Sequence, residues 1–103
     1  MTKEQLKEQA INCLRNVYDP EIPVNIYDLG LIYGIDVDDD CNVKVTMTLT
    51  APDCPEAEFM VHEAKDFISH IEGVKDVDIQ ITFDPPWDFN QLTDAVKLEL
   101  GIL

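Results

Sequence analysis

The stretch that decides the fold is Leu29–Thr50, LGLIYGIDVDDDCNVKVTMTLT. Hydrophobic and polar residues alternate along Leu29–Val37 and again along Val43–Leu49, which is the pattern of half-buried β-strands. A short acidic tip, Asp38–Asn42, separates the two runs. Two such runs joined by a polar turn predict an antiparallel hairpin with one face in the core. The inward residues are predicted to be Leu29, Leu31, Tyr33, Ile35, Val37, Val43, Val45, Met47 and Leu49, and the outward residues of the second run to be Lys44, Thr46, Thr48 and Thr50.

Helices are predicted on either side of this hairpin. The first should span about Lys3–Val17, because Thr2 and Gln5 form a capping box and an apolar face follows. The second should begin at Pro55, since proline suits the first helical position, and should end at Gly73. Its apolar face is predicted to carry Ala57, Met60, Ala64, Phe67, Ile68 and Ile71.

A third strand and a short last helix follow. Val77–Phe83 alternates again and predicts a strand, whose inward residues are Val77, Ile79, Ile81 and Phe83. The segment DPPWDFN ends this strand, and Asp88 with Gln91 would cap the last helix. The order α-β-β-α-β-α predicts an α+β fold, a two-layer α/β sandwich in which helices cover a small mixed sheet. A length of 103 residues predicts one domain, residues 1–103.

The charge balance excludes two classes of partner. The chain has 21 acidic and 7 basic residues and a formal net charge of −14. Such a charge repels both the phosphate backbone of nucleic acids and an anionic membrane surface. No apolar run reaches the roughly 18 residues of a membrane span, and the first residues lack the apolar core of a signal peptide. We therefore expect a cytoplasmic protein that binds neither nucleic acid nor membranes.

The strand-to-helix junction Thr48–Met60, TLTAPDCPEAEFM, places Cys54 directly before a predicted helix. The N–H groups at a helix N-terminus favour an anion, so a thiol there tends towards the thiolate, which attacks electrophiles and binds soft metals. Nearby carboxylates oppose this ionisation by like charge. The alternative is that Cys54 only fills space at the helix end. The supporting residues around it are Thr50, Asp53, Pro55 and Glu56.

A second candidate site is the loop DPEIPVNIYDLG, Asp19–Gly30, which carries the carboxylates of Asp19, Glu21 and Asp28. Hydrolases use pairs of carboxylates as acid and base, and metal ions bind them. Loops rich in Asp, Pro and Gly are also ordinary turns. If this loop lies beside Cys54, carboxylate and thiolate together would suit iron or zinc.

The acidic hairpin tip has a simpler interpretation. Asp36, Asp38 and Asp40 have the spacing of a calcium-binding EF-hand loop. Cys41 replaces the glycine that the sharp turn of that loop needs, and Met47 replaces its bidentate glutamate. We therefore predict a solvated tip in which Cys41 has no functional role.

The other cysteine, the histidines and the tryptophan also allow structural interpretations. Cys13 lies on the apolar face of the first helix and is predicted to be a core residue. His62 and His70 are too far apart for a metal pair on one helix and are predicted to be exposed. Trp87 either anchors a partner or covers the end of the sheet. The three widely spaced cysteines argue against a disulfide framework.

Three motifs together resemble a known family. They are DPEIPVNIYDLGLIYGI (Asp19–Ile35), TLTAPDCP (Thr48–Pro55) and FDPPWDFNQLTDAVKLELGI (Phe83–Ile102). In this order and over nearly the whole chain they resemble the SufT/PaaD-like family of metal–sulfur cluster biosynthesis domains, which includes a eukaryotic cytosolic iron–sulfur targeting subunit. A free-standing domain of this length is most similar to bacterial SufT. The resemblance implies a fold similar to the C-terminal domain of NifU-type scaffolds.

The resemblance also implies an accessory or targeting role in iron–sulfur cluster assembly rather than an enzyme. The notable cysteine of the family falls on Cys54, and its acidic loop falls on Asp19 and Glu21. One thiol cannot supply the four ligands that a cluster normally takes, so we expect no firmly bound cofactor. Either a client or carrier completes the ligands of transiently bound iron or an iron–sulfur cluster, or the protein holds no cluster and only docks other proteins. The implied partners are a Suf-type scaffold or carrier and apo client proteins. A homodimer that shares one cluster stays open.

Three alternatives remain at this point. The first is a PaaD-like factor that matures an oxygenase, although the additional cysteine-rich sequence usual in that branch is absent here. The second is a thiol-dependent enzyme, although neither candidate loop contains a histidine to act as base. The third is an interaction module in which Cys54 is structural.

Overall fold

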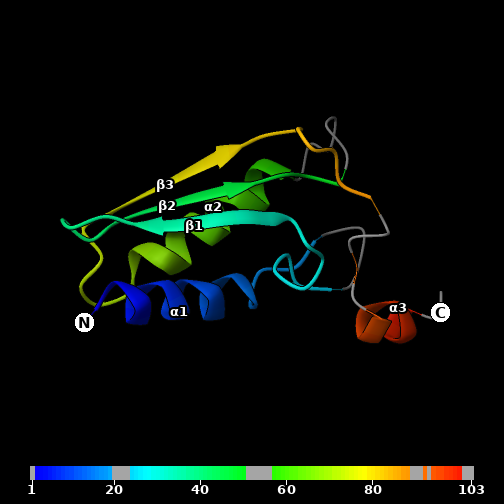
Figure 1. Ribbon diagram of the computed structural model, residues 1–103, viewed down its shortest axis with the longest axis horizontal. Coiled ribbons are helices and arrows are strands. Elements are labelled where there is room, and N and C mark those ends of the chain that lie inside the picture. The colour runs from blue at the N-terminus through cyan, green and yellow to red at the C-terminus, as the bar shows by residue number, and fades with distance from the viewer. Residues whose placement is uncertain (1, 20–23, 51–56, 89–91, 93, 101–103) are drawn as a thin grey trace.

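The computed structural model describes residues 2–19, 24–50, 57–88, 92 and 94–100. Its elements follow the predicted order α-β-β-α-β-α (Figure 1). The prediction of a small mixed sheet with helices is thereby confirmed, whereas the similarity to NifU-type domains stays a prediction. The helices and strands are α1 (Lys3–Leu14), β1 (Ile32–Val37), β2 (Asn42–Met47), α2 (Ala57–Ser69), β3 (Asp76–Ile81) and α3 (Asp94–Leu100).

The sheet has the order β1-β2-β3, so β2 is the central strand. β1 and β2 pair antiparallel, which confirms the predicted hairpin, and β2 and β3 pair parallel. In this register Val45 stands opposite Ile35 on one side and Ile79 on the other. Parallel neighbours need a crossover connection, and α2 is part of it. The segment that contains Cys54 therefore begins this crossover.

The protein has two layers. α1 and α2 lie on the same face of the sheet (Figure 1). The opposite face is polar, and one row across it consists of Asp36, Lys44 and Asp78, which are register partners on the three strands. All three side chains are exposed. An amphipathic sheet of this kind buries only the face that the helices cover.

The first helix is shorter than predicted. Its capping box is present. The Thr2 hydroxyl oxygen accepts from the Gln5 backbone amide, and the Gln5 side-chain oxygen accepts from the Thr2 backbone amide. The helix ends at Leu14 rather than at Val17. The following residues form tighter turns, in which the Val17 amide donates to the Leu14 carbonyl at 3.2 Å. Val17 is nevertheless only 1% exposed, so its predicted place in the core is correct.

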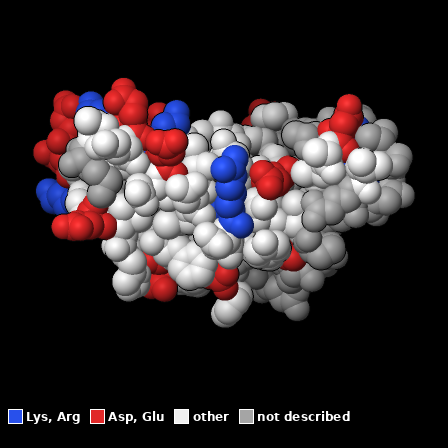
Figure 2. Space-filling model, turned by 90° about the horizontal axis from the view of Figure 1, so that it is seen from below, with Lys and Arg blue, Asp and Glu red and all other residues white. Residues whose placement is uncertain are grey.

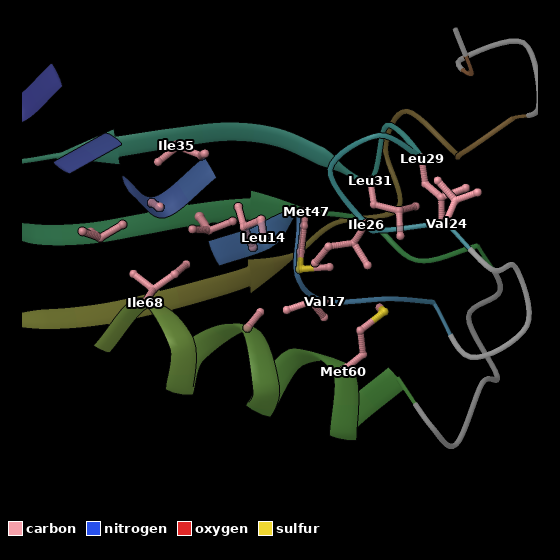
Figure 3. Packing of buried hydrophobic residues seen from close by; sticks show 14 of the residues in the cluster. Leu14, Val17, Val24, Ile26, Leu29, Leu31, Ile35, Met47, Met60 and Ile68 are labelled. Carbon is pink, nitrogen blue, oxygen red and sulfur yellow. The ribbon is translucent and has the colours of Figure 1, made fainter. Parts of the chain in front are cut away.

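The core extends beyond the regular elements into the turn at residues 24–31. Ile26, Leu29 and Leu31 on this turn are fully buried. They belong to the same cluster as Met47 of β2 and Met60 of α2 (Figure 3). The turn is therefore part of the hydrophobic core, although its sequence has no regular period.

Further predictions of burial and of helix position are wrong. Ile81 and Phe83 were expected to point inward, but they are 39% and 48% exposed, because no described helix covers the end of β3 and the residues after it. Phe67 on α2 is 37% exposed. The last helix begins at Asp94, too far along the chain for Asp88 to cap it, and Gln91 lies outside the described residues.

The hairpin tip is the solvated turn that the sequence predicts. The Asp38 carboxylate accepts from the Asp40 and Asn42 backbone amides and from the Asn42 side chain, at 2.8–3.0 Å. These bonds, chiefly those from Asn42, hold the pKa of Asp38 below its ordinary value. Asp39 pairs with Lys3. Figure 2 shows acidic side chains gathered at this end of the molecule, where the tip lies near the start of α1. The carboxylate of Asp38 thus closes a turn.

Two register partners on β2 and β3 differ in burial, and substituting each in turn shows how much burial contributes to stability. Met47 and Ile81 stand opposite each other on β2 and β3, yet Met47 is fully buried and Ile81 is 39% exposed. We expect Met47→Ala to lower the free energy of unfolding by about 2–5 kcal/mol, because it leaves a cavity. The control Ile81→Ala should cost about 1 kcal/mol or less. Urea denaturation measures both, and equal losses would contradict the burial described here.

Candidate functional site

The acidic loop is held at both ends by backbone contacts. Tyr18 and Asn25 form an isolated antiparallel bridge, and the Ile26 amide donates to the Val17 carbonyl at 2.8 Å. The Asp19 amide donates to the Val24 carbonyl at 3.3 Å. Residues 20–23, including the predicted site residue Glu21, lie outside the described residues. The loop therefore leaves and rejoins the core at a fixed place.

Asp19 connects this loop to the strand that leads to Cys54. Asp19 is only 6% exposed, which is unusual for a carboxylate. The Thr50 hydroxyl donates to Asp19 Oδ2 at 3.4 Å, across 31 positions of sequence. Thr50 follows β2 and stands four residues before Cys54. The structure thus brings together two of the predicted site residues, one from each candidate segment.

The other residues predicted around Cys54 cannot be placed in the same way. Asp53, Cys54, Pro55 and Glu56 lie outside the described residues. The predicted approach of the Cys54 thiol to the carboxylates therefore stays a prediction. The structure does show a contact between the two candidate segments, the hydrogen bond from Thr50 to Asp19.

Asp28 has a local role in its own turn. Its carboxylate accepts from the Asn25 side-chain amide at 2.8 Å, and its backbone amide donates to the Asn25 side-chain oxygen at 2.9 Å. Arg15 approaches Asp28 at 3.9 Å and lies over the ring of Tyr27, 4.9 Å from the centroid. These contacts favour the interpretation of Asp28 as a residue that shapes the turn.

Thr48 is a residue whose position the sequence did not reveal. Alternation predicted an outward side chain, but Thr48 is fully buried next to fully buried Met47. The cause is that the chain leaves the sheet after Met47 and passes the buried turn, where the Thr48 amide donates to the Leu31 carbonyl at 2.8 Å. The Thr48 hydroxyl has no hydrogen-bond partner among the described residues. Thr48 and Thr50 thus place two threonine hydroxyls on the stretch between β2 and Cys54.

The segment after β3 completes this end of the protein. The Trp87 indole N–H donates to the Leu29 carbonyl at 2.7 Å, and the Tyr33 hydroxyl donates to the Pro85 carbonyl at 2.6 Å. Trp87 is therefore packed against the core and bonded to the buried turn, which favours its structural interpretation. The buried turn, the end of β2 and the segment after β3 lie at the same end of the molecule (Figure 1, right). Described residues of all three sequence motifs thus lie at this end.

The other cysteines and the histidines lie elsewhere. Cys13 is partly buried against the core and donates its thiol to the Phe67 carbonyl at 3.6 Å, and burial raises its pKa. Cys41 is at the hairpin tip, with φ of 65°. His62 and His70 are exposed on α2 and its end, as predicted.

Two features are absent from the described residues. These residues contain no group of three or more His, Cys, Asp or Glu side chains placed to hold a metal ion. None of the helices in the described part of the chain has the length and apolar character that crossing a bilayer requires.

The contact between Thr50 and Asp19 can be tested by removing one oxygen. We expect Thr50→Val to lower the free energy of unfolding by about 1 kcal/mol, because the buried carboxylate loses a donor. The matched control is Thr46→Val on β2, where the side chain is half-buried and should change stability by less than about 0.5 kcal/mol. Thermal or urea unfolding measures both. A Thr50 variant as stable as the control would show that this contact contributes nothing.

Comparison with known proteins agrees with the arrangement of these motifs. A protein from Porphyromonas gingivalis named Fe-S protein maturation auxiliary factor is 50% identical over 96% of this chain and 94% of its own length. The Fe-S protein maturation auxiliary factor SufT of Staphylococcus aureus is 34% identical over 84% of this chain and 98% of its own length. Both relatives are thus similar in size to this chain.

A solved structure has the same fold. The crystal structure of a domain of unknown function, DUF59, from Bacillus anthracis superposes with a TM-score of 0.89 at 30% identity, over 98% of this chain and 96% of that one. The family model described as iron-sulfur cluster assembly protein matches residues 7–81, which include the whole acidic loop and the junction with Cys54. The chain belongs to this family of iron–sulfur cluster assembly proteins.

Proposed function

We propose that this protein is an accessory factor that helps client proteins acquire iron–sulfur clusters, and that Cys54 is its functional thiol. The observation that carries the proposal is the bond from Thr50 to the buried carboxylate of Asp19. This bond ties the acidic loop to the strand end from which the Cys54 segment begins. The names of the relatives, both maturation factors, support the same role.

The chemistry of Cys54 follows from its place in the sequence. It stands three residues before α2, which begins at Ala57. A helix N-terminus stabilises a thiolate, while Glu58 in the first turn of α2 opposes it by like charge. A bound iron ion would reverse the effect of nearby carboxylates, because they would then neutralise the metal. The site is therefore suited to a thiol that binds a soft cation when one is delivered.

One thiol limits what the chain can hold. A cluster normally takes four ligands, mostly thiolates, so Cys54 would supply one and a scaffold, a carrier or the apo client would supply the others. The cluster is then cargo held between two proteins rather than a resident cofactor. We propose that the protein works in the cytoplasm without enzymatic turnover, with Suf-type assembly proteins and apo clients as partners. Its net charge of −14 favours partners with basic surfaces.

Replacing two cysteines in turn tests this proposal. We expect Cys54→Ser to lower the activity of iron–sulfur enzymes in the native host about as much as deletion of the gene, because serine is a poor ligand for iron in a cluster. Cys41→Ser makes the same change at the hairpin tip and should leave client activity unchanged. Circular dichroism checks that both variants fold.

Two other results would replace the proposal. If client enzymes keep full activity in the Cys54→Ser strain, Cys54 is structural and the protein is a docking module. If the pure protein turns over a thioester or a disulfide, and Cys54→Ser abolishes this turnover, the protein is a thiol-dependent enzyme.

A further inference from the structure

β3 forms an edge of the sheet with one side unpaired by any described strand. The Thr82 amide donates to the Met47 carbonyl at 2.9 Å, and the β2–β3 register directs the backbone groups of Asp78 and Gln80 to β2 as well. Backbone groups alternate in direction along a strand, so those of Ile79 and Ile81 point to the free edge. Among the described residues, nothing pairs with them.

The side chains along this edge are also uncovered. Ile79 is half-buried and Ile81 is 39% exposed, although both point to the helical layer. At the opposite edge, Ile35 of β1 points to the same layer and is only 7% exposed. A hollow of about 310 Å³ opens beside β3, between the strand and α2. It is lined by Leu49, Glu58, Val61, His62 and Ile81. The edge of β3 thus offers both unpaired backbone groups and a partly exposed apolar surface.

We propose that the free edge of β3 binds an extended segment of a partner protein in which apolar and basic residues alternate. Such a segment would add a fourth strand and pair with the backbone of Ile79 and Ile81. Its side chains would point alternately to the two faces of the sheet. The apolar ones would fill the hollow beside Val61, and the others would lie on the open polar face.

Charge determines which side chains the polar face accepts. Across the three strands, one row on this face reads Asp36, Lys44 and Asp78, with alternating signs. The next position in this row belongs to the added strand, and opposite charges on neighbouring strands stabilise each other. A lysine or arginine there would continue the alternation. On β3 and within three residues of its ends, the exposed charges are Asp76, Asp78 and Asp84 against Lys75. Exposed Glu58 lines the hollow.

The same charges argue against a second copy of the chain. Two β3 edges brought together would place acidic side chains of both copies side by side, and each chain carries a net charge of −14. The inference goes beyond the proposed function, because strand addition needs no thiol. Leu49 and Glu58 do, however, flank Cys54 in the sequence, so the bound segment would lie where the chain enters and leaves the thiol segment.

A synthetic peptide tests the proposal directly. The probe has about nine residues, long enough for one strand, with Val and Lys alternating and both ends blocked. Two control peptides keep its length: one has the same composition without alternation, and one has Glu in place of Lys. We expect calorimetry to show binding of the first peptide that weakens with added salt, and neither control to bind comparably. The amides of Ile79 and Ile81 should exchange with deuterium more slowly when the peptide is bound.

Variants of the protein locate the binding site. Ile79→Pro removes an N–H that faces the free edge, a place where strands tolerate proline, and should weaken binding at least about tenfold. Asp78→Asn should weaken binding about threefold, the effect of losing one exposed charge pair. Asp36→Asn makes the same change on the other side of Lys44, at the opposite edge, and should have little effect. Cys54→Ser should bind the peptide normally, which separates this inference from the proposed function.

The proposal is overturned if the alternating peptide does not bind, or if the non-alternating peptide binds equally well, since that is attraction to charge alone. It is also overturned if Asp36→Asn weakens binding as much as Asp78→Asn. Dimerisation of the chain that protects Ile79 and Ile81 without peptide would show that a second copy occupies the edge. If Ile79→Pro does not fold, the pair of aspartate variants and the protected amides decide the question.

Discussion

The burial of the turn at residues 24–31 is the constraint on which this end of the protein depends. Ile26, Leu29 and Leu31 are fully buried, so an irregular stretch of chain must satisfy its backbone groups inside the core. It does so with neighbours distant in sequence: Leu31 accepts from Thr48, and Leu29 accepts from Trp87. Each of these bonds fixes another segment, so one buried turn sets the positions of the strand end and of the segment after β3.

The candidate site is a product of the same constraint. Asp19 precedes the turn in the sequence, and its amide donates to the Val24 carbonyl. Thr50 stands two residues after Thr48, whose amide donates to the Leu31 carbonyl. The contact of Asp19 with Thr50, at 3.4 Å, follows because the turn holds both segments of the chain in place. Asp19 is only 6% exposed, and burying a carboxylate is costly without polar partners, which the Thr50 hydroxyl helps to supply. Membership in an iron–sulfur assembly family gives that site its chemical context.

Local periodicity was enough to predict most of the fold. The hairpin, the two long helices and the buried row Val43, Val45 and Met47 all follow from alternation or helical spacing. Periodicity failed where tertiary cover decides burial. Ile81 belongs to a correct alternation, yet it is exposed because no described helix reaches over it, whereas Thr48 breaks the alternation and is buried under the turn. The contact between Asp19 and Thr50 spans 31 positions and has no local sequence signal. From the sequence, the approach of the acidic loop to Cys54 could therefore be stated only as a condition.

The bond between Trp87 and Leu29 has a consequence for the order of assembly. A ribosome makes Leu29 and Thr50 long before Trp87, and the parallel partner β3 also comes late. Contacts between distant segments form slowly, because the intervening chain must first be brought together. During synthesis, the hairpin can fold while the turn still lacks its indole donor. The nascent chain would then carry the hairpin before the segment after β3 has reached the buried turn, so this end of the protein is completed only when β3 and Trp87 are in place.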